Sequence, residues 1–298
     1  MTPALGLELR DATATALAVD DAGGVVARVV VPSRGDFAAA ALEAVDAVAR
    51  TAGSGPLGIA ADFGEGSSPA AVIALLKQRY AGPFVQFGVT PPGTAAAVAE
   101  AWVGAARNAR DLVFFAVADH AIAGLIRDGA PVVGVGRRAA SVAWLALNPV
   151  EREDYRKIGC LEAEVAATGI VRRLIWRIKA GDRSRVADTT GGDLSGITAD
   201  DVLNAARDGD GVSISVVRDT AKYLGMAAAN LVVISDPEKL VLGGIMATAA
   251  DLLFEPVRTE LARRLPRPMM EALAIAPAAL GADAAAIGAA RLATAALR

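Results

Sequence analysis

The sequence predicts an α/β protein made of two successive halves that repeat the same order of elements. The chain has 298 residues, about the length of two domains, and 54% of them are hydrophobic, enough for a large buried core. Each half begins with three short apolar strands joined by tight turns and continues with alternating strands and helices. A pattern that starts again partway along the chain indicates a duplicated architecture, and we expect the ligand site in the cleft between the halves.

Turn-forming segments separate the elements of the first half. An Asp- and Gly-rich turn at residues 20–24 divides two apolar strands, and Gly53-Ser54-Gly55-Pro56 ends a helix that places Leu42, Val45 and Val48 on one face. We expect strands at residues 5–9, 13–19, 25–31, 57–61 and 84–89, and helices at 37–50, 70–79 and from after 94 to about 106.

The pattern starts again at Asp111, and Arg127-Asp128-Gly129 forms the hairpin turn of the second set of strands. We expect strands at 112–117, 121–126, 131–135, 231–234, 240–242 and 273–276, and helices at 161–179, 198–206, 212–230, 247–264 and from 284 to the end. These elements predict an N-terminal domain at residues 1–108 and a C-terminal domain at 109–284. The closing helix, about 285–298, is expected to pack back on the first domain.

Composition and charge exclude several classes of function. The formal net charge is −3, with 30 basic and 33 acidic residues, which gives no electrostatic case for nucleic acid or an anionic membrane. Cys160 has no second cysteine for a disulfide, which fits a reducing cytoplasm, and Cys160 and His120 are too few for a closed zinc site. The N-terminus has no signal-peptide pattern, and three prolines interrupt the long uncharged stretch at residues 80–99. We therefore expect a cytoplasmic protein without a membrane segment.

General catalytic motifs are absent. The sequence contains neither the GxxxxGK[ST] phosphate loop nor the GxSxG nucleophile motif. Gly134-Val135-Gly136 is followed by Arg137-Arg138 instead of a dinucleotide-binding pattern, so we interpret it as a turn. His120 lies between two strands, where an exposed turn histidine is a better interpretation than a catalytic one.

Several segments, read in order, resemble one known family. They are Ala96-Ala97-Val98-Ala99-Glu100-Ala101-Trp102, Gly159-Cys160-Leu161-Glu162, Asp236-Pro237-Glu238, Val241-Leu242-Gly243-Gly244 and Leu280-Gly281-Ala282-Asp283. These segments resemble the ROK family of sugar kinases and sugar-responsive repressors, and the resemblance covers nearly the whole chain. It implies the actin-like ATPase fold, with two α/β domains around an interdomain cleft.

Two phosphate-binding loops of that family are altered in this sequence. The family's Asp-Ile-Gly-Gly-Thr loop reads Glu8-Leu9-Arg10-Asp11-Ala12, and its Gly-Thr-Gly loop reads Ala118-Asp119-His120. Side chains replace glycines that let backbone N–H groups approach phosphate, and Asp11 and Asp119 add negative charge. Glu8 keeps a carboxylate that could help hold Mg²⁺ through water. The resemblance therefore predicts weak or absent ATP binding.

The family's catalytic loop is also altered. Its Asn-Asp-Ala-Asn sequence corresponds to Pro91-Pro92-Gly93-Thr94, so the catalytic base position is Pro92. A proline has no side chain that accepts a proton, and a positioned general base contributes about 10²–10⁴ in rate. The resemblance predicts that no catalytic residue remains in this loop.

The sugar-clamp and zinc positions differ as well. The family's sugar-clamping Glu and zinc-binding His correspond to Val142 and Leu145, and its three zinc-binding cysteines correspond to Glu153, Tyr155 and Cys160. We therefore expect no zinc or other metal site.

A few candidate site residues remain. Glu162 corresponds to a sugar-contacting Glu of the family, and the alternative is a carboxylate stabilised at the start of a helix. Gly243 and Gly244 are interpreted as a turn that needs positive φ rather than as proof of nucleotide binding. The ligand-binding candidates are Glu162, Asp62, Glu65 and Thr94, and the nucleotide-side candidates are Glu8, Gly243 and Gly244.

Three functions stay open. The first is a non-catalytic pseudokinase that binds a sugar or sugar phosphate, with a regulatory role. The second is a diverged kinase that uses ATP and Mg²⁺, with Asp62, Glu65 or Asp119 as its acid/base residue. The third is the effector domain of a transcriptional regulator; because the first strand begins by Leu5, we expect no direct contact with nucleic acid. The family habit and the alanine-rich helices predict a homodimer.

Overall fold

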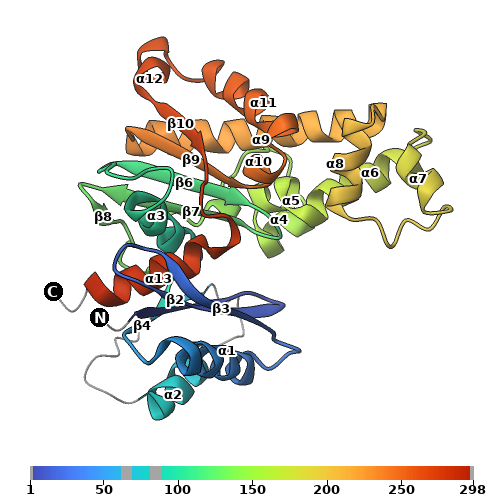
Figure 1. Ribbon diagram of the computed structural model, residues 1–298. Helices are drawn as coiled ribbons and strands as arrows, with labels where there is room; N and C mark the ends of the chain where they lie inside the picture. Colours follow the sequence, from blue (N-terminus) through green and yellow to red (C-terminus); the bar gives the residue numbers. More distant parts are fainter. Residues whose placement is uncertain (1–2, 62–68, 81–88, 296–298) are drawn as a thin grey trace. The chain divides into compact units, whose positions relative to one another are not determined.

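The computed structural model describes residues 3–61, 69–80 and 89–295 (Figure 1). The chain divides into two compact units. Unit 1 contains Met1–Phe114, Ala123–Ala140 and Ala278–Arg298, and unit 2 contains Phe115–Ile122 and Ser141–Pro277. Within the described residues, no helix has both the length and the apolar character needed to cross a membrane.

The first sheet has the strand order β3-β2-β1-β4-β5. Its strands are β1 (Ala4–Leu9), β2 (Thr13–Val19), β3 (Val25–Pro32), β4 (Leu57–Ala61) and β5 (Val89–Thr90). The first three strands are antiparallel neighbours, whereas β4 and β5 run parallel to β1 and to each other. The predicted opening strands are thus present. Of the strand expected at 84–89, residues 84–88 lie outside the described part of the chain.

Side chains of β1 alternate between two packed faces of this sheet. Leu5, Leu7 and Leu9 pack with α1 (Phe37–Ala52) and α2 (Pro69–Arg79) in one hydrophobic core. Helix α1 begins at the N-cap Asp36, whose carboxylate accepts a hydrogen bond from the Ala39 N–H. Figure 1 shows α1 and α2 on one side of the sheet and α13 on the other.

The backbone of helix α13 (Ala284–Ala295) lies so close to its neighbours that only small side chains fit between them. A Cβ atom at Gly6 of β1 would lie 1.9 Å from the Ala286 carbonyl oxygen. A Cβ atom at Gly288 would lie 1.7 Å from the Ala95 carbonyl oxygen of α3 (Pro92–Trp102). Alanine and glycine at these positions therefore let α13 contact both the sheet and α3 closely.

The second sheet has the strand order β10-β9-β6-β7-β8. Its strands are β6 (Leu112–Val117), β7 (Ala121–Arg127), β8 (Ala130–Pro131), β9 (Lys239–Gly244) and β10 (Ala274–Pro277). Asp128 and Gly129 form the predicted hairpin turn with positive φ, at 53° and 79°. Of the strand expected at 131–135, only Pro131 lies in a strand, β8.

Helices supply most of unit 2. They are α4 (Glu153–Ile158), α5 (Cys160–Val165), α6 (Ala167–Lys179), α7 (Arg185–Thr189), α8 (Ala199–Arg207), α9 (Gly211–Ser235), α10 (Ile245–Thr248), α11 (Ala250–Ala262) and α12 (Arg267–Ala272); short 3₁₀ turns lie at Val142–Trp144 in this unit and at Gly281–Asp283 in unit 1. The helix expected at 161–179 is divided at Ala166, whose extended backbone (φ −65°, ψ 164°) separates α5 from α6.

The strand expected at 231–234 is wrong, because these residues complete α9. Leu231 and Val232 are buried, whereas Val233 and Ile234 are exposed. A strand buries alternate residues, so two buried residues followed by two exposed ones fit a helix. The helix then ends at Asp236, which adopts a left-handed conformation with φ 44°.

Candidate functional site

Glu162 lies in the first turn of α5 and joins this helix to the turn before β7. One carboxylate oxygen, Oε1, lies 3.0 Å from His120 Nδ1, and the other, Oε2, accepts a 2.9 Å hydrogen bond from the Ala121 N–H. The side chain of Glu162 is 11% exposed, and that of His120 is 53% exposed. The carboxylate therefore holds the turn in place, a role that neither sequence interpretation of Glu162 included. The sugar contact stays a prediction.

A glycine positions this carboxylate. Gly159 precedes α5 with φ 90°, and a Cβ atom there would lie 2.2 Å from the Ala143 carbonyl oxygen. Only glycine tolerates both this positive φ and this close approach of the Ala143 carbonyl. The structure therefore explains why the Gly159-Cys160-Leu161-Glu162 segment begins with glycine.

The pairing of His120 with Glu162 was missed from the sequence. The histidine was interpreted as an exposed turn residue, and it is half exposed at the turn. Its ring nevertheless lies against a carboxylate 42 positions away along the chain. No local pattern links the two residues, since only the packing of α5 brings them together.

Glu8 is buried on β1 and paired with Arg10. The Arg10 Nε atom lies 2.9 Å from Glu8 Oε1, and Arg10 Nη2 donates a 3.0 Å hydrogen bond to Glu8 Oε2 and another of 3.0 Å to the Ala282 carbonyl oxygen. Burial raises the pKa of Glu8, and the hydrogen bond and charge of Arg10 oppose that rise. A magnesium ion at Glu8 would stand beside a guanidinium ion, so these residues do not fit a Mg²⁺ site as arranged.

The loop that leads into α3 carries no carboxylate among residues 91–94. Pro92 is the first residue of α3, and Pro91 precedes it with φ −54° and ψ 138° and makes no capping hydrogen bond through its side chain. A Cβ atom at Gly93 would lie 2.2 Å from the Ala123 carbonyl oxygen. Thr94 is fully buried, and its hydroxyl has no hydrogen-bond partner in the described part of the chain. The candidates Asp62 and Glu65 lie outside the described residues.

The Gly243-Gly244 segment ends β9. Gly244 has φ 61°, and a Cβ atom there would lie 1.9 Å from the Val117 carbonyl oxygen of β6. This position therefore needs glycine for backbone conformation and for packing. Nucleotide contact by Gly243 or Gly244 stays a prediction.

The positions that correspond to the family's zinc ligands do not form a metal centre. Cys160 is buried, Glu153 is exposed and pairs with Lys157 at 2.6 Å, and the Tyr155 hydroxyl donates a hydrogen bond to Glu164. Across residues 3–61, 69–80 and 89–295, no three His, Cys, Asp or Glu side chains come together as candidate ligands. The residues present do not fit zinc.

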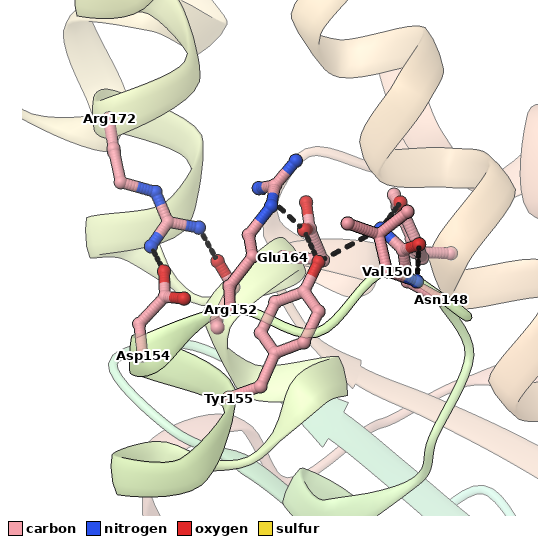
Figure 2. Close-up of polar contacts among 9 residues, drawn as sticks. Asn148, Val150, Arg152, Asp154, Tyr155, Glu164 and Arg172 are labelled. Carbon is pink, nitrogen blue, oxygen red and sulfur yellow. Dashed lines mark hydrogen bonds and ion pairs between the residues drawn. The ribbon is translucent and has the colours of Figure 1, made fainter.

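A hydrogen-bonded network occupies this region instead (Figure 2). Glu164 is buried and lies 3.2 Å from Arg152 Nη1, while Asn148 Nδ2 lies 3.0 Å from the Tyr155 hydroxyl and 3.3 Å from the Tyr223 hydroxyl. Burial, the hydrogen bond to Glu164 and the charge of Glu164 raise the pKa of Tyr155, so it stays protonated at neutral pH. Sequence reasoning assigned no role to Glu164, Arg152 or Asn148.

Comparisons with known proteins agree with this architecture. The model of the ROK family matches residues 83–296. A glucokinase of Halalkalibacterium halodurans is 34% identical over 197 residues, which is 65% of this chain but only 59% of the glucokinase. The chain therefore aligns with less than two thirds of that relative's length.

Solved structures of two relatives match almost the entire chain. A ROK family glucokinase from Streptomyces griseus, in complex with glucose and AMPPNP, has a TM-score of 0.79 at 22% identity and covers 98% of this chain and 99% of its own. A ROK family transcriptional regulator homologous to the E. coli MLC protein has a TM-score of 0.82 at 19% identity, over 98% of this chain and 78% of its own. The predicted fold class, the duplicated α/β fold of actin-like ATPases, is confirmed.

Proposed function

Because this chain belongs to the ROK family, we propose that it is a member that binds a small sugar or sugar phosphate and does not phosphorylate it. One observation carries this proposal. Pro92 stands where the family resemblance places the catalytic base, and it begins α3 without any carboxylate on the neighbouring Pro91, Gly93 or Thr94. Phosphoryl transfer to a hydroxyl group needs a residue that accepts its proton, and these four cannot do so.

The arrangement around β1 supports the loss of nucleotide binding. Arg10 holds both carboxylate oxygens of Glu8, where the family resemblance expects a carboxylate linked to Mg²⁺. Asp11 and Asp119 add negative charge at the two positions where glycine-rich loops bind phosphate in the family. We therefore propose that the protein works without ATP, Mg²⁺ or zinc.

A sugar ligand is supported by the relatives. The Streptomyces griseus glucokinase was solved with glucose, and this chain keeps Glu162 at a sugar-contacting position of the family. Glu162 Oε1 pairs with His120 and Oε2 accepts a hydrogen bond from the Ala121 N–H, and a carboxylate oxygen has two lone pairs. Glu162 thus retains acceptor capacity for a ligand hydroxyl.

A diverged kinase is the second candidate, because a curated relative at 34% identity is a glucokinase. Asp62, Glu65 or Asp119 would then supply the carboxylate that Pro92 lacks. An effector domain of a transcriptional regulator is the third candidate, supported by the regulator with the same fold. A homodimer stays a prediction for each of them.

A coupled kinase assay over a panel of sugars, combined with calorimetric titration of the same sugars, tests the proposal. We expect measurable heat of binding for at least one sugar and no turnover above background. Turnover above about 1 s⁻¹, within the ordinary range of enzymes, would establish the kinase instead. In that case, Ala variants of Asp62, Glu65 and Asp119 identify the base as the one whose loss abolishes turnover.

A further inference from the structure

Unit 2 contains a cavity of about 580 Å³ whose walls are rich in positive charge. The walls come from the loop before α4 and from α5, α6 and α9, with one residue after α11. Five cationic residues line the cavity: Arg152, Arg173, Arg177, Lys222 and Arg264. Two carboxylates, Glu164 and Asp219, line it as well.

Four of the five cations have a carboxylate partner. Arg152 Nη1 lies 3.2 Å from Glu164, and Lys222 Nζ lies 2.9 Å from Asp219. Two further ion pairs involve residues outside the lining, namely Arg177 with Asp182 and Arg264 with Glu260. Both lining carboxylates are therefore engaged with other cations.

Arg173 is different, because no ion pair neutralises its guanidinium group among the described residues. Its Nη2 atom donates a hydrogen bond to the Thr220 hydroxyl, while Nε and Nη1 are buried and have no hydrogen-bond partner in that part of the chain. Burial lowers the pKa of Arg173, and the charges of Glu164 and Asp219 oppose that change. A partly buried cation with two buried, unused donors is unfavourable unless another group supplies further negative charge.

Trp176 adds a flat apolar surface to the same cavity. Its side chain is 47% exposed. The guanidinium carbons of Arg152 and Arg172 lie 5.3 Å and 4.9 Å from the centroid of its ring. An aromatic face next to cationic groups suits a ligand that combines a planar or apolar part with an anionic group. Figure 2 shows the polar contacts of Arg152 with Glu164 and of Arg172 with Asp154.

From this combination we propose that the cavity binds a small organic phosphate. A dianionic phosphate group offsets the charge of Arg173 and accepts hydrogen bonds from the neighbouring guanidinium groups, whose planar geometry suits phosphate oxygens. The organic part of the ligand packs on Trp176. The proposed site is separate from Glu162: Glu162 and Glu164 are two positions apart on α5 and therefore project about 200° apart around its axis. It also stands independently of whether the chain phosphorylates a sugar.

Phenyl phosphate and inorganic phosphate are the probes, and thermal unfolding and calorimetry are the measurements, all at constant ionic strength set with NaCl. We expect phenyl phosphate to bind and to raise the unfolding temperature by a few degrees at concentrations well above its dissociation constant. Inorganic phosphate binds more weakly, because it does not contact Trp176. Trp176→Ala therefore weakens phenyl phosphate binding and leaves that of inorganic phosphate nearly unchanged.

Arg173→Met is the decisive variant, and Arg218→Met is its matched control, since Arg218 is exposed on α9 and does not line the cavity. We expect Arg173→Met to weaken phenyl phosphate binding about tenfold or more and Arg218→Met to leave it unchanged. Without ligand, Arg173→Met unfolds at the same or a higher temperature than the parent protein, because it removes a largely buried charge that has no ion-pair partner among the described residues.

Three results would overturn the proposal: no stabilisation beyond that by NaCl, unchanged binding in Arg173→Met, or equal losses in both variants. If Arg173→Met does not fold, Arg173→Lys replaces it, because lysine keeps the charge and loses the planar fork of donors. Wild-type affinity in Arg173→Lys then counts against the proposal, and a loss of severalfold or more supports it.

Discussion

Arg10 pairs with the Glu8 carboxylate at the end of β1, so this carboxylate is not available to a metal ion. The sequence alone predicted that Arg10 would obstruct a phosphate loop, but not that its guanidinium group would hold both oxygens of Glu8. Glu8 lies on β1 and Arg10 directly follows its last residue, Leu9, so the two side chains share one face only if the strand alternation continues one residue further. Whether Glu8 would be buried depended on the packing of the whole sheet, which no local pattern encodes.

The Glu8–Arg10 pair predicts a pH-dependent loss of stability in Arg10→Met. The raised pKa of Glu8 means that its ionised form is unfavourable in the folded state, and Arg10 limits this effect. Without Arg10, the pKa of Glu8 in the folded protein rises further. The variant therefore loses most free energy of unfolding at pH values above this pKa, where Glu8 is ionised. Because Arg10 is about half exposed, we expect a loss of about 1–2 kcal/mol at pH 8.

Urea unfolding at pH 8 and pH 5 checks this prediction. The loss shrinks as the pH falls, since protonation of Glu8 then removes the uncompensated charge in the folded protein. In a double variant with Glu8→Gln, the pH dependence of the loss disappears. An equal loss at both pH values would contradict this role of Arg10.

Gly244 gives a second prediction about a single residue. Gly244→Ala combines a positive φ with a Cβ atom that would lie 1.9 Å from the Val117 carbonyl oxygen. We expect it to lower the free energy of unfolding by about 3 kcal/mol or more. Gly209→Ala is the control, because Gly209 also has a positive φ of 85° but nothing within 4 Å of its Cβ position.

Urea unfolding of the two glycine variants separates strain from packing. Gly209→Ala should lose only about 1–2 kcal/mol, the cost of the left-handed conformation alone. Similar losses in both variants would show that the contact with β6 contributes little.

The elements were predicted best where the hydrophobic pattern and the turn residues agree. The opening strands of the first sheet and the strands at 112–117 and 121–126 have strong turns beside them and appear as expected, whereas the one expected at 131–135 does not. Prediction failed where an apolar run was too short to distinguish strand from helix, as at residues 231–234, or where a break had no sequence signal, as at Ala166. The short helices α4, α7 and α12 were missed because each has at most six residues, too few for a periodic pattern.

The link between α5 and the turn before β7 yields a prediction at this scale. Glu162→Ala leaves the Ala121 N–H without its acceptor, so we expect the free energy of unfolding to fall by about 1–3 kcal/mol. His120→Ala removes only the half-exposed partner and should lower it by less than about 1 kcal/mol. Urea unfolding of both variants at neutral pH measures the two losses in free energy of unfolding. A larger loss for His120→Ala than for Glu162→Ala would contradict the anchoring role of the carboxylate.

At the scale of the whole molecule, the sequence predicted the family and the fold, because the matching segments are spread from residue 96 to residue 283. It predicted the candidate site less well. Glu162 and Gly244 lie against residues that are distant in the sequence, Glu8 is paired with Arg10, and Glu164 and Arg173 were not candidates at all. Such contacts depend on which helix faces which loop, which no local pattern in the sequence shows. The predicted domain boundaries at residues 108 and 284 stay a prediction.

We propose that this ROK family chain has given up nucleotide chemistry while keeping a ligand-binding role. Calorimetric titration with ATP and Mg²⁺, with and without a saturating sugar, tests it most directly. We expect no saturable heat of nucleotide binding in either case, because Arg10, Asp11 and Asp119 stand where the family resemblance places the phosphate-binding loops. A micromolar dissociation constant for ATP, about −8 kcal/mol of binding free energy, would contradict the claim.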